Sequence, residues 1–236
     1  SSGSMAFTPW VLLTAISVTS PGSRRAILQA LAIRPGTSAR GVSAFSMRAR
    51  YTYAMPARQP LPLLWLLSDA RNDGALEGAL AALPPGSGFV FRHYHLDPPA
   101  RAARFRELTI AATAAGHMTV LAGDAGLARE WRAAGIYGDA DRMGHGAGLL
   151  KLATAHDGDE LAAAGRAGAD GVFLSPVFAT RSHPGARPLG IHGFHVLTQQ
   201  SPVPVIALGG MTKDRARELN WPRWGAIDGL VPPQPA

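Results

Sequence analysis

Short runs of apolar residues recur along the chain from residue 61 onward, and each run ends in small or polar residues. Most are rich in Val, Leu, Ile or Phe without alternating polar positions, which is typical of strands buried on both faces. Eight runs have this pattern, and they lie at residues 63–67, 88–91, 118–122, 135–137, 149–153, 171–175, 203–208 and 225–231.

Segments of helical composition separate most of these strands, at residues 74–83, 99–115, 127–134, 159–167 and 192–200. Strands that alternate with helices predict an α/β fold with a parallel sheet. Eight such repeats define a (β/α)8 or TIM barrel of about 250 residues, so residues 61–236 predict a compact one. Because the sequence stops soon after the eighth strand, we expect the last helix to be missing. The N-terminal segment or a partner subunit would then cover the apolar surface left there.

The first 60 residues have a different composition, with seven arginines and neither Asp nor Glu. The rest of the chain carries 16 basic and 16 acidic side chains, so the net charge of +7 belongs to this segment. We expect residues 1–60 to be an Arg/Ser-rich extension that is disordered or not part of the natural protein. Three interpretations stay open: a translated upstream region with the natural start at Met47 or Met55, a targeting peptide, and an ordered accessory segment. Since the barrel region is neutral, nucleic-acid binding is not predicted.

Composition excludes several kinds of site. The chain has no cysteine, which rules out disulfides, thiolate metal sites and a cysteine nucleophile. No apolar run reaches the roughly 18 residues that span a membrane, so we expect a cytoplasmic protein with no membrane partner. No metal site is predicted, because no metal-ligand spacing connects the histidines His93, His95, His183, His192 and His195.

Two stretches near the C-terminal end carry the most information about function. The first is GVFLSPVFATRSHPGARPLG at residues 171–190, and the second is PVPVIALGGM at residues 202–211. Each reads as a buried strand followed by a loop, and α/β folds bind ligands at the loops that follow their strands. The pair Gly209-Gly210 in the second loop allows a phosphate group to contact backbone N–H groups.

Together with LLWLLSDAR and ATAHDGDELAAAGRAGADGVFLSP, these motifs resemble the thiamine-phosphate synthase/TenI family. The resemblance covers roughly residues 61–231 and implies a TIM barrel whose mouth binds phosphate or pyrophosphate. Synthases of that family carry cationic and metal-binding residues that this chain lacks. Arg92 is kept, but Tyr94 and His183 stand where lysines bind pyrophosphate, and Gly123 stands where an Asp binds Mg²⁺. A pyrophosphate leaving group would therefore be poorly stabilised here.

The TenI branch of the family is known for thiazole tautomerisation, which needs a phosphate anchor and a general acid/base but no metal. His156 matches a family histidine after the fifth strand, and imidazole suits proton transfer near neutral pH. The resemblance thus implies that His156 is the catalytic residue. The residues expected to bind phosphate or substrate are Arg92, Thr154, Thr180, Ser182, Gly209 and Gly210.

We interpret the sequence as a TenI-like barrel that binds a phosphorylated thiazole and acts as a thiazole tautomerase, with no cofactor. Two alternatives stay open. One is a divergent thiamine-phosphate synthase that joins a pyrimidine pyrophosphate to thiazole phosphate, in which case Mg²⁺ is needed. The other is a catalytically degenerate barrel that only binds a ligand. The expected partner is a small phosphorylated thiazole or pyrimidine, and the sequence leaves open whether the protein is a homo-oligomer.

Overall fold

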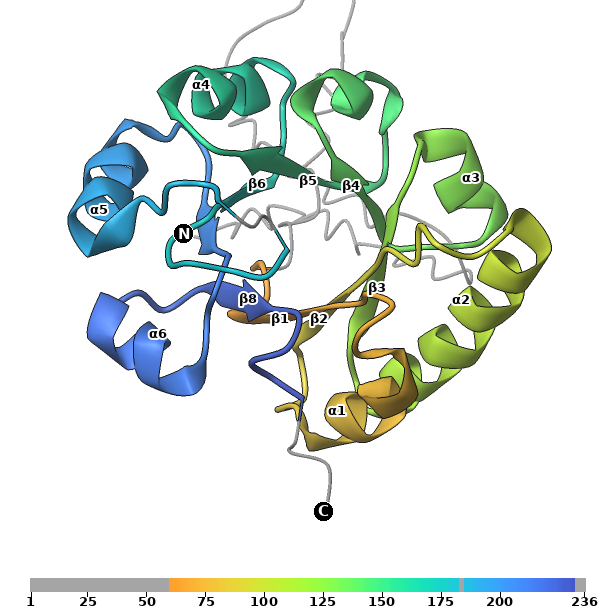
Figure 1. The fold of residues 1–236 in the computed structure, drawn as a ribbon. Coiled ribbons are helices and arrows are strands. Elements are labelled where there is room, and N and C mark those ends of the chain that lie inside the picture. The colour runs from red at the N-terminus through yellow and green to blue at the C-terminus, as the bar shows by residue number, and fades with distance from the viewer. Residues whose placement is uncertain (1–59, 183–184, 232–236) are drawn as a thin grey trace, which may run out of the picture. The chain divides into compact units, whose positions relative to one another are not determined.

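The computed structural model describes residues 60–182 and 185–231, which form a closed barrel of eight parallel strands (Figure 1). Each strand pairs with the next along the chain, and β8 pairs with β1 to close the ring. The strands are β1 (Leu64–Leu67), β2 (Gly88–Phe91), β3 (Met118–Ala122), β4 (Gly135–Gly138), β5 (Leu150–Ala155), β6 (Gly171–Leu174), β7 (Val205–Ala207) and β8 (Trp224–Ala226). The predicted TIM-barrel fold is confirmed.

Helices surround the strands as an outer ring (Figure 1). They are α1 (Leu76–Ala82), α2 (Pro98–Ala114), α3 (Ala125–Glu130), α4 (Gly158–Arg166), α5 (Gly190–Gln200) and α6 (Lys213–Leu219). Two 3₁₀ segments, η1 (Asp73–Ala75) and η2 (Ala140–His145), complete the secondary structure of the described residues. The segment η2 stands between β4 and β5, whereas every other pair of consecutive strands is connected through an α-helix.

Helix boundaries follow local capping chemistry. The Asp124 carboxylate accepts a hydrogen bond from the Leu127 N–H at 2.8 Å and so caps α3. This helix therefore begins two residues before the predicted position of 127, and it ends at Glu130 because Arg132 adopts a left-handed conformation (φ 59°). Along the described part of the chain no helix follows β8.

The described residues include no helix that is long and apolar enough to cross a membrane. The predicted N-terminal extension, residues 1–60, lies outside the described residues except for Pro60.

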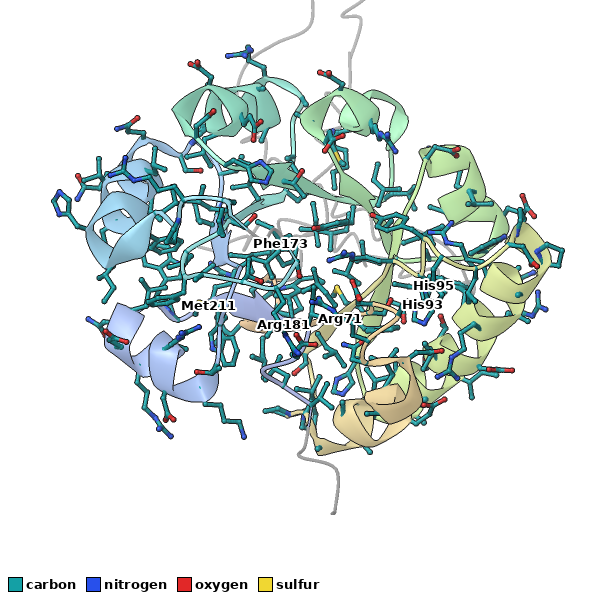
Figure 2. All side chains as sticks on the ribbon, in the orientation of Figure 1. Arg71, His93, His95, Phe173, Arg181 and Met211 are labelled. Atoms are coloured by element: carbon teal, nitrogen blue, oxygen red, sulfur yellow. The ribbon has the colours of Figure 1, made fainter. Side chains whose placement is uncertain are left out.

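Side chains alternate between the inside of the barrel and the layer beneath the helices. Val90, Val120 and Phe173 belong to the apolar cluster inside the barrel, and their chain neighbours Phe91 and Leu121 belong to the cluster beneath the helices. This is the two-residue period of a β-strand. Figure 2 shows Phe173 in the middle of the barrel.

Candidate active site

A cavity of about 800 Å³ opens at the carboxyl ends of the strands, where TIM barrels have their active sites. The structure brings all of the sequence-predicted site residues together on its wall, although these residues come from the ends of four different strands, β2, β5, β6 and β7. They are Arg92, Thr154, His156, Thr180, Ser182, Gly209 and Gly210. Their roles stay predictions, whereas their common location is a property of the fold.

Strand alternation explains why β5 supplies two of these residues. Leu152 packs inside the barrel, whereas Ala153 and Ala155 belong to the apolar layer between the strands and the helices. Thr154 and His156 therefore continue the inward series that begins at Leu152, and both line the cavity. The Thr154 hydroxyl donates to the Asp139 carboxylate at 3.2 Å, which links the ends of β4 and β5.

His156 is half-exposed and is held by a residue of the following helix. Its Nδ1 lies 2.8 Å from Glu160 Oε2, and its backbone N–H donates to the same oxygen at 2.7 Å. An ionised carboxylate only accepts hydrogen bonds, so Glu160 favours the tautomer with the proton on Nδ1. In that tautomer Nε2 is the basic nitrogen of the ring. The pair thus orients an imidazole at the cavity wall, which is how general bases are positioned.

Positions 209 and 210 require glycine for two reasons: the backbone conformation and the lack of space for a side chain. Both have positive φ angles, +91° and +62°. A Cβ atom on Gly209 would lie 2.6 Å from the Cα of Pro176, and one on Gly210 would lie 2.5 Å from the carbonyl oxygen of Ala179. Neither glycine N–H donates to another described residue. Both amides are therefore available to an anion that enters the cavity.

The charged residues of the cavity wall favour anions. Four of them are arginines (Arg92, Arg142, Arg181 and Arg215), whereas two are carboxylates (Asp139 and Asp228). Their formal charges therefore total +2 with the histidine neutral. Arg92 is mostly buried, and its Nε–H has no hydrogen-bond partner among the described residues. A buried donor without a partner is costly, so Arg92 is suited to receive a ligand oxygen.

The carboxylates on the cavity wall come from different strands. Asp124 is not on the cavity wall and is occupied in capping α3. Asp139 follows β4 and Asp228 follows β8, so these two come from opposite sides of the eight-stranded ring. Mg²⁺ binds through neighbouring carboxylates or through carboxylates plus ligand phosphates. Asp139 and Asp228 are therefore not neighbours on the described cavity wall.

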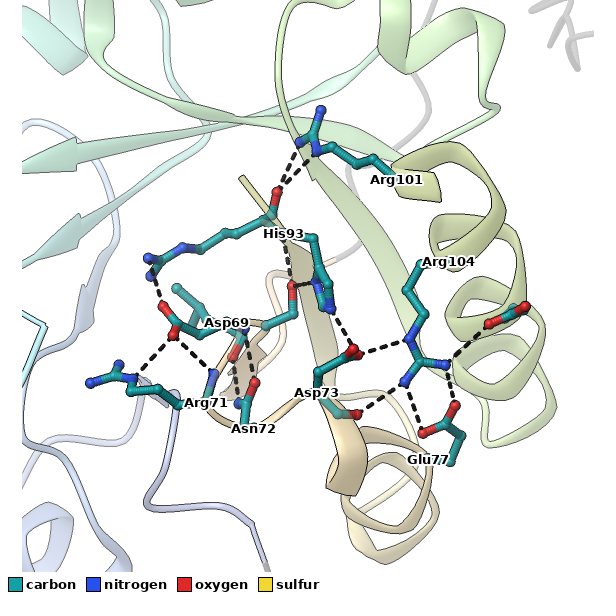
Figure 3. A network of polar contacts seen from close by, with 12 residues as sticks. Asp69, Arg71, Asn72, Asp73, Glu77, His93, Arg101 and Arg104 are labelled. Carbon is teal, nitrogen blue, oxygen red and sulfur yellow. Dashed lines mark hydrogen bonds and ion pairs between the residues drawn. The ribbon is translucent and has the colours of Figure 1, made fainter. Parts of the chain in front are cut away.

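A polar network missed by the sequence analysis joins the ends of β1, β2 and β6 (Figure 3). Arg71 donates to Asp69 Oδ1 at 3.0 Å and to the Ser182 hydroxyl at 2.8 Å, and Arg92 Nη2 lies 3.4 Å from Asp69 Oδ2. Burial raises the pKa of Asp69, but hydrogen bonds and charge from Arg71 and Arg92 outweigh it and hold the pKa below its ordinary value. The network fixes the Arg92 side chain at the cavity edge.

Three further charged residues at the cavity mouth, Arg181, Asp228 and Arg215, were not assigned a contact from the sequence. Arg181 pairs with Asp228 at 2.9 Å, and both side chains are accessible. Arg215 donates to the Gly210 carbonyl at 2.6 Å and lies over the Phe178 ring. Arg181 and Asp228 lie in loops that follow strands, and Arg215 lies in α6, but nothing in the sequence shows which of these segments meet. Arg215 thereby supports the glycine turn.

Comparison with known proteins agrees with this geometry. Residues 65–223, which are 159 of 236, match the sequence profile described as thiamine monophosphate synthase. A putative thiamine-phosphate synthase 2 of Aquifex aeolicus is 38% identical over 64 residues, which are 27% of this chain and 34% of the relative. A thiamine-phosphate synthase of Lactococcus lactis subsp. cremoris is 31% identical over 114 residues, 45% of this chain and 52% of the relative. The matched segments thus span at most about half the length of these two relatives.

Solved structures show the same fold at low identity. Thiamine phosphate pyrophosphorylase from Pyrococcus furiosus superposes with a TM-score of 0.60 at 20% identity, covering 71% of this chain and 85% of that one. FabK from Thermotoga maritima gives a TM-score of 0.58 at 15% identity, covering 72% and 59%. Such identities show the fold alone, but the family profile extends over two thirds of the chain. The protein therefore belongs to the thiamine-phosphate synthase/TenI family.

Proposed function

We propose that the cavity binds a phosphorylated thiazole and that His156 transfers a proton in it, as in a thiazole tautomerase. The observation that carries this proposal is the position of the imidazole. It lies on the cavity wall, and Glu160 accepts from Nδ1 at 2.8 Å. The same wall carries a net positive set of side chains, which suits a ligand with a phosphate group.

The chemistry needs one group that first accepts a proton and then returns it. Tautomerisation removes a proton from one position of the thiazole and delivers a proton to another, so no atom is gained or lost. Nε2 of His156 can accept the first proton, and the resulting imidazolium is stabilised by the Glu160 carboxylate. Imidazolium then donates the proton at the second position. General acid–base help of this kind typically speeds a reaction about 10²- to 10⁴-fold.

Binding and orientation are assigned to other groups. The Gly209 and Gly210 amides, the mostly buried Arg92 guanidinium and the exposed Arg181 guanidinium are donors that can hold a phosphate. Guanidinium groups bind phosphate oxygens in pairs, which fixes the direction of the ligand as well as its position. The thiazole ring then lies between this anchor and His156.

Synthase activity is the second candidate, and the arginines of the cavity favour it. Arg142 and Arg181 supply positive charge at a mouth that lacks the family's lysines, and charge of this kind stabilises a leaving pyrophosphate. The curated relatives also carry the name thiamine-phosphate synthase. Against it stands the separation of Asp139 and Asp228, the two carboxylates of the described cavity wall, which follow opposite strands of the ring. We therefore expect synthase turnover to be weak or absent.

The decisive experiment compares His156→Gln with the unchanged protein on thiazole carboxylate phosphate. We expect tautomerisation to fall by at least about 10²-fold while the dissociation constant of the ligand changes little, because the phosphate anchor is untouched. His192→Gln is the matched control, since it removes an exposed histidine on α5 and should leave the rate unchanged. Formation of thiamine phosphate from the pyrimidine pyrophosphate and thiazole phosphate is measured with the same proteins.

Each result selects one function. An active His156→Gln protein would reject the tautomerase mechanism. Turnover in the synthase reaction near the typical enzyme range of about 1 to 10³ per second would favour the second candidate. Ligand binding with neither activity would identify a barrel that binds without catalysis.

A further inference from the structure

The segment after β2 presents two different faces. Val90 packs inside the barrel, and Arg92 and Tyr94 continue that side by lining the cavity. The intervening residues His93 and His95 are not on the cavity wall. Figure 2 places both histidines together toward α2, away from Phe173 at the barrel centre. The His-Tyr-His sequence thus puts two imidazoles outside the site described above.

The fold brings a carboxylate to these imidazoles from another loop. Asp73 opens the 3₁₀ segment η1, and its Oδ1 lies 2.8 Å from His93 Nε2 (Figure 3). One ligand atom from each of Asp73, His93 and His95 falls within 4.8 Å of the other two. The two histidine rings lie 5.2 Å apart at an angle of 36°. Two imidazoles and one carboxylate form a donor set that suits transition metals.

A second observation concerns the other nitrogen of His93. Nδ1 lies 2.7 Å from the Ser68 hydroxyl, which is buried and also accepts the Arg92 backbone N–H at 2.7 Å. Histidines that bind a metal through one nitrogen commonly hold the other against an oxygen atom, which fixes the ring. His93 is buried and also stacks on Phe91 with 4.6 Å between ring centroids. Its Nε2 therefore has a fixed direction toward Asp73.

The local charge also favours a cation. Arg104 contacts three carboxylates, Asp73 at 2.8 Å, Glu77 at 2.5 Å and Glu107 at 3.2 Å. Three negative charges against one positive charge leave the cluster with a formal charge of −2. Both described hydrogen bonds to the Asp73 carboxylate end on Oδ1, so Oδ2 can bind a cation while Arg104 stays in place.

We propose that Asp73, His93 and His95 bind one divalent transition-metal ion of the Zn²⁺ class on the outer side of the barrel mouth. Imidazole nitrogens select such ions over Mg²⁺, which prefers oxygen ligands. Three protein ligands leave one position of a tetrahedral site for water. The ion would tie the loop after β1 to the segment after β2, in which Arg92 and Tyr94 alternate with the two ligands. It would therefore fix a part of the cavity wall from behind.

The test is calorimetric titration of the untagged full chain with Zn²⁺ after removal of bound metal with EDTA. We expect one equivalent to bind, Mg²⁺ to give no binding, and His95→Ala to lower the Zn²⁺ affinity by at least about 10-fold. His95 is exposed, so its loss should leave the fold intact. His192→Ala removes an exposed histidine far along the chain and should bind Zn²⁺ like the unchanged protein.

A second measurement keeps the proposal testable if His95→Ala does not fold. Co²⁺ added to the unchanged protein should give visible absorption of a four-coordinate site, and Asp73→Asn should weaken it. Absence of stoichiometric Zn²⁺ binding by the unchanged protein would overturn the proposal. Zn²⁺ affinity that persists in His95→Ala, or that is lost instead in His156→Gln, would assign the ion to another place and overturn it equally.

Discussion

Phe173 on β6 is the side chain whose removal should test the packing inside the barrel most directly. Its side chain is fully buried. It meets the Trp65 ring edge-on at 5.8 Å between centroids and the Tyr137 ring at 5.3 Å. Tyr137 also lines the cavity and is itself buried, which raises the pKa of its hydroxyl. Phe173→Ala would therefore leave a void beneath the ligand site.

The cost follows from these contacts. Full burial of a phenylalanine contributes about 1.5–3 kcal/mol, and each aromatic pair adds about 0.5–1.5 kcal/mol. Two such pairs bring the total into the range of about 3–5 kcal/mol observed for Phe→Ala in cores, where an unfilled cavity adds its own cost. Domains are stable by only about 5–15 kcal/mol, so this is a large fraction of the whole. The melting temperature should fall by roughly 6–20 °C.

Urea unfolding of the unchanged protein, Phe173→Ala and Ile110→Ala measures this prediction. Ile110 lies on α2 and is 72% exposed, so its truncation should change the free energy of unfolding by less than about 0.5 kcal/mol. Phe173→Leu, which keeps most of the volume, should fall between the two. If Phe173→Ala cost no more than Ile110→Ala, the interior would not be packed as described.

Two further changes probe the mouth of the barrel. Gly210→Ala should destabilise the protein clearly more than Gly74→Ala in thermal unfolding, because the new Cβ would lie 2.5 Å from the Ala179 oxygen at a φ of +62°, whereas Gly74 has no atom within 4 Å. Equal shifts for the two variants would refute this account of the glycine turn. Asp69 has a folded-state pKa below its unfolded value of about 3.9, so its stabilisation is present above that pH and is lost as the pH falls through the folded pKa. Asp69→Asn should therefore lower the free energy of unfolding at pH 7 but much less at pH 3, and a gap independent of pH would contradict the ion pair with Arg71.

Strands that are buried on both faces could be predicted from the sequence. The bounds of helices that depend on capping residues were harder to predict. The run at residues 118–122 has no polar side chain except Thr119, and β3 has the predicted bounds. The predicted strand at residues 203–208 is shorter as β7, which spans Val205–Ala207. The 3₁₀ segment η2 could not be foreseen, since its length and composition fix neither a helix nor a strand.

The shared location of the candidate site residues could be predicted because parallel strands in a barrel place all their carboxyl ends on one side. Contacts between side chains of different loops could not be predicted in this way. Arg71 and Ser182 are 111 positions apart and meet at 2.8 Å. Asp73 reaches His93 across 20 positions. Nothing in a single sequence marks such pairs, so the histidines alone showed no metal spacing, and the Asp69 network was not foreseen.

The positive lining of the cavity has a kinetic consequence as well as an energetic one. Four arginines and two aspartates at a concave mouth focus the electric field outward, which raises the concentration of anions at the entrance. Ligands with a phosphate group are then captured faster than neutral ones of equal size. At physiological ionic strength this attraction extends only about 8 Å, so dissolved salt acts mainly on the encounter and much less on a ligand already enclosed. The arginines thus raise the rate at which anionic ligands associate with the cavity, and this effect is separate from their contribution to the affinity of a bound ligand.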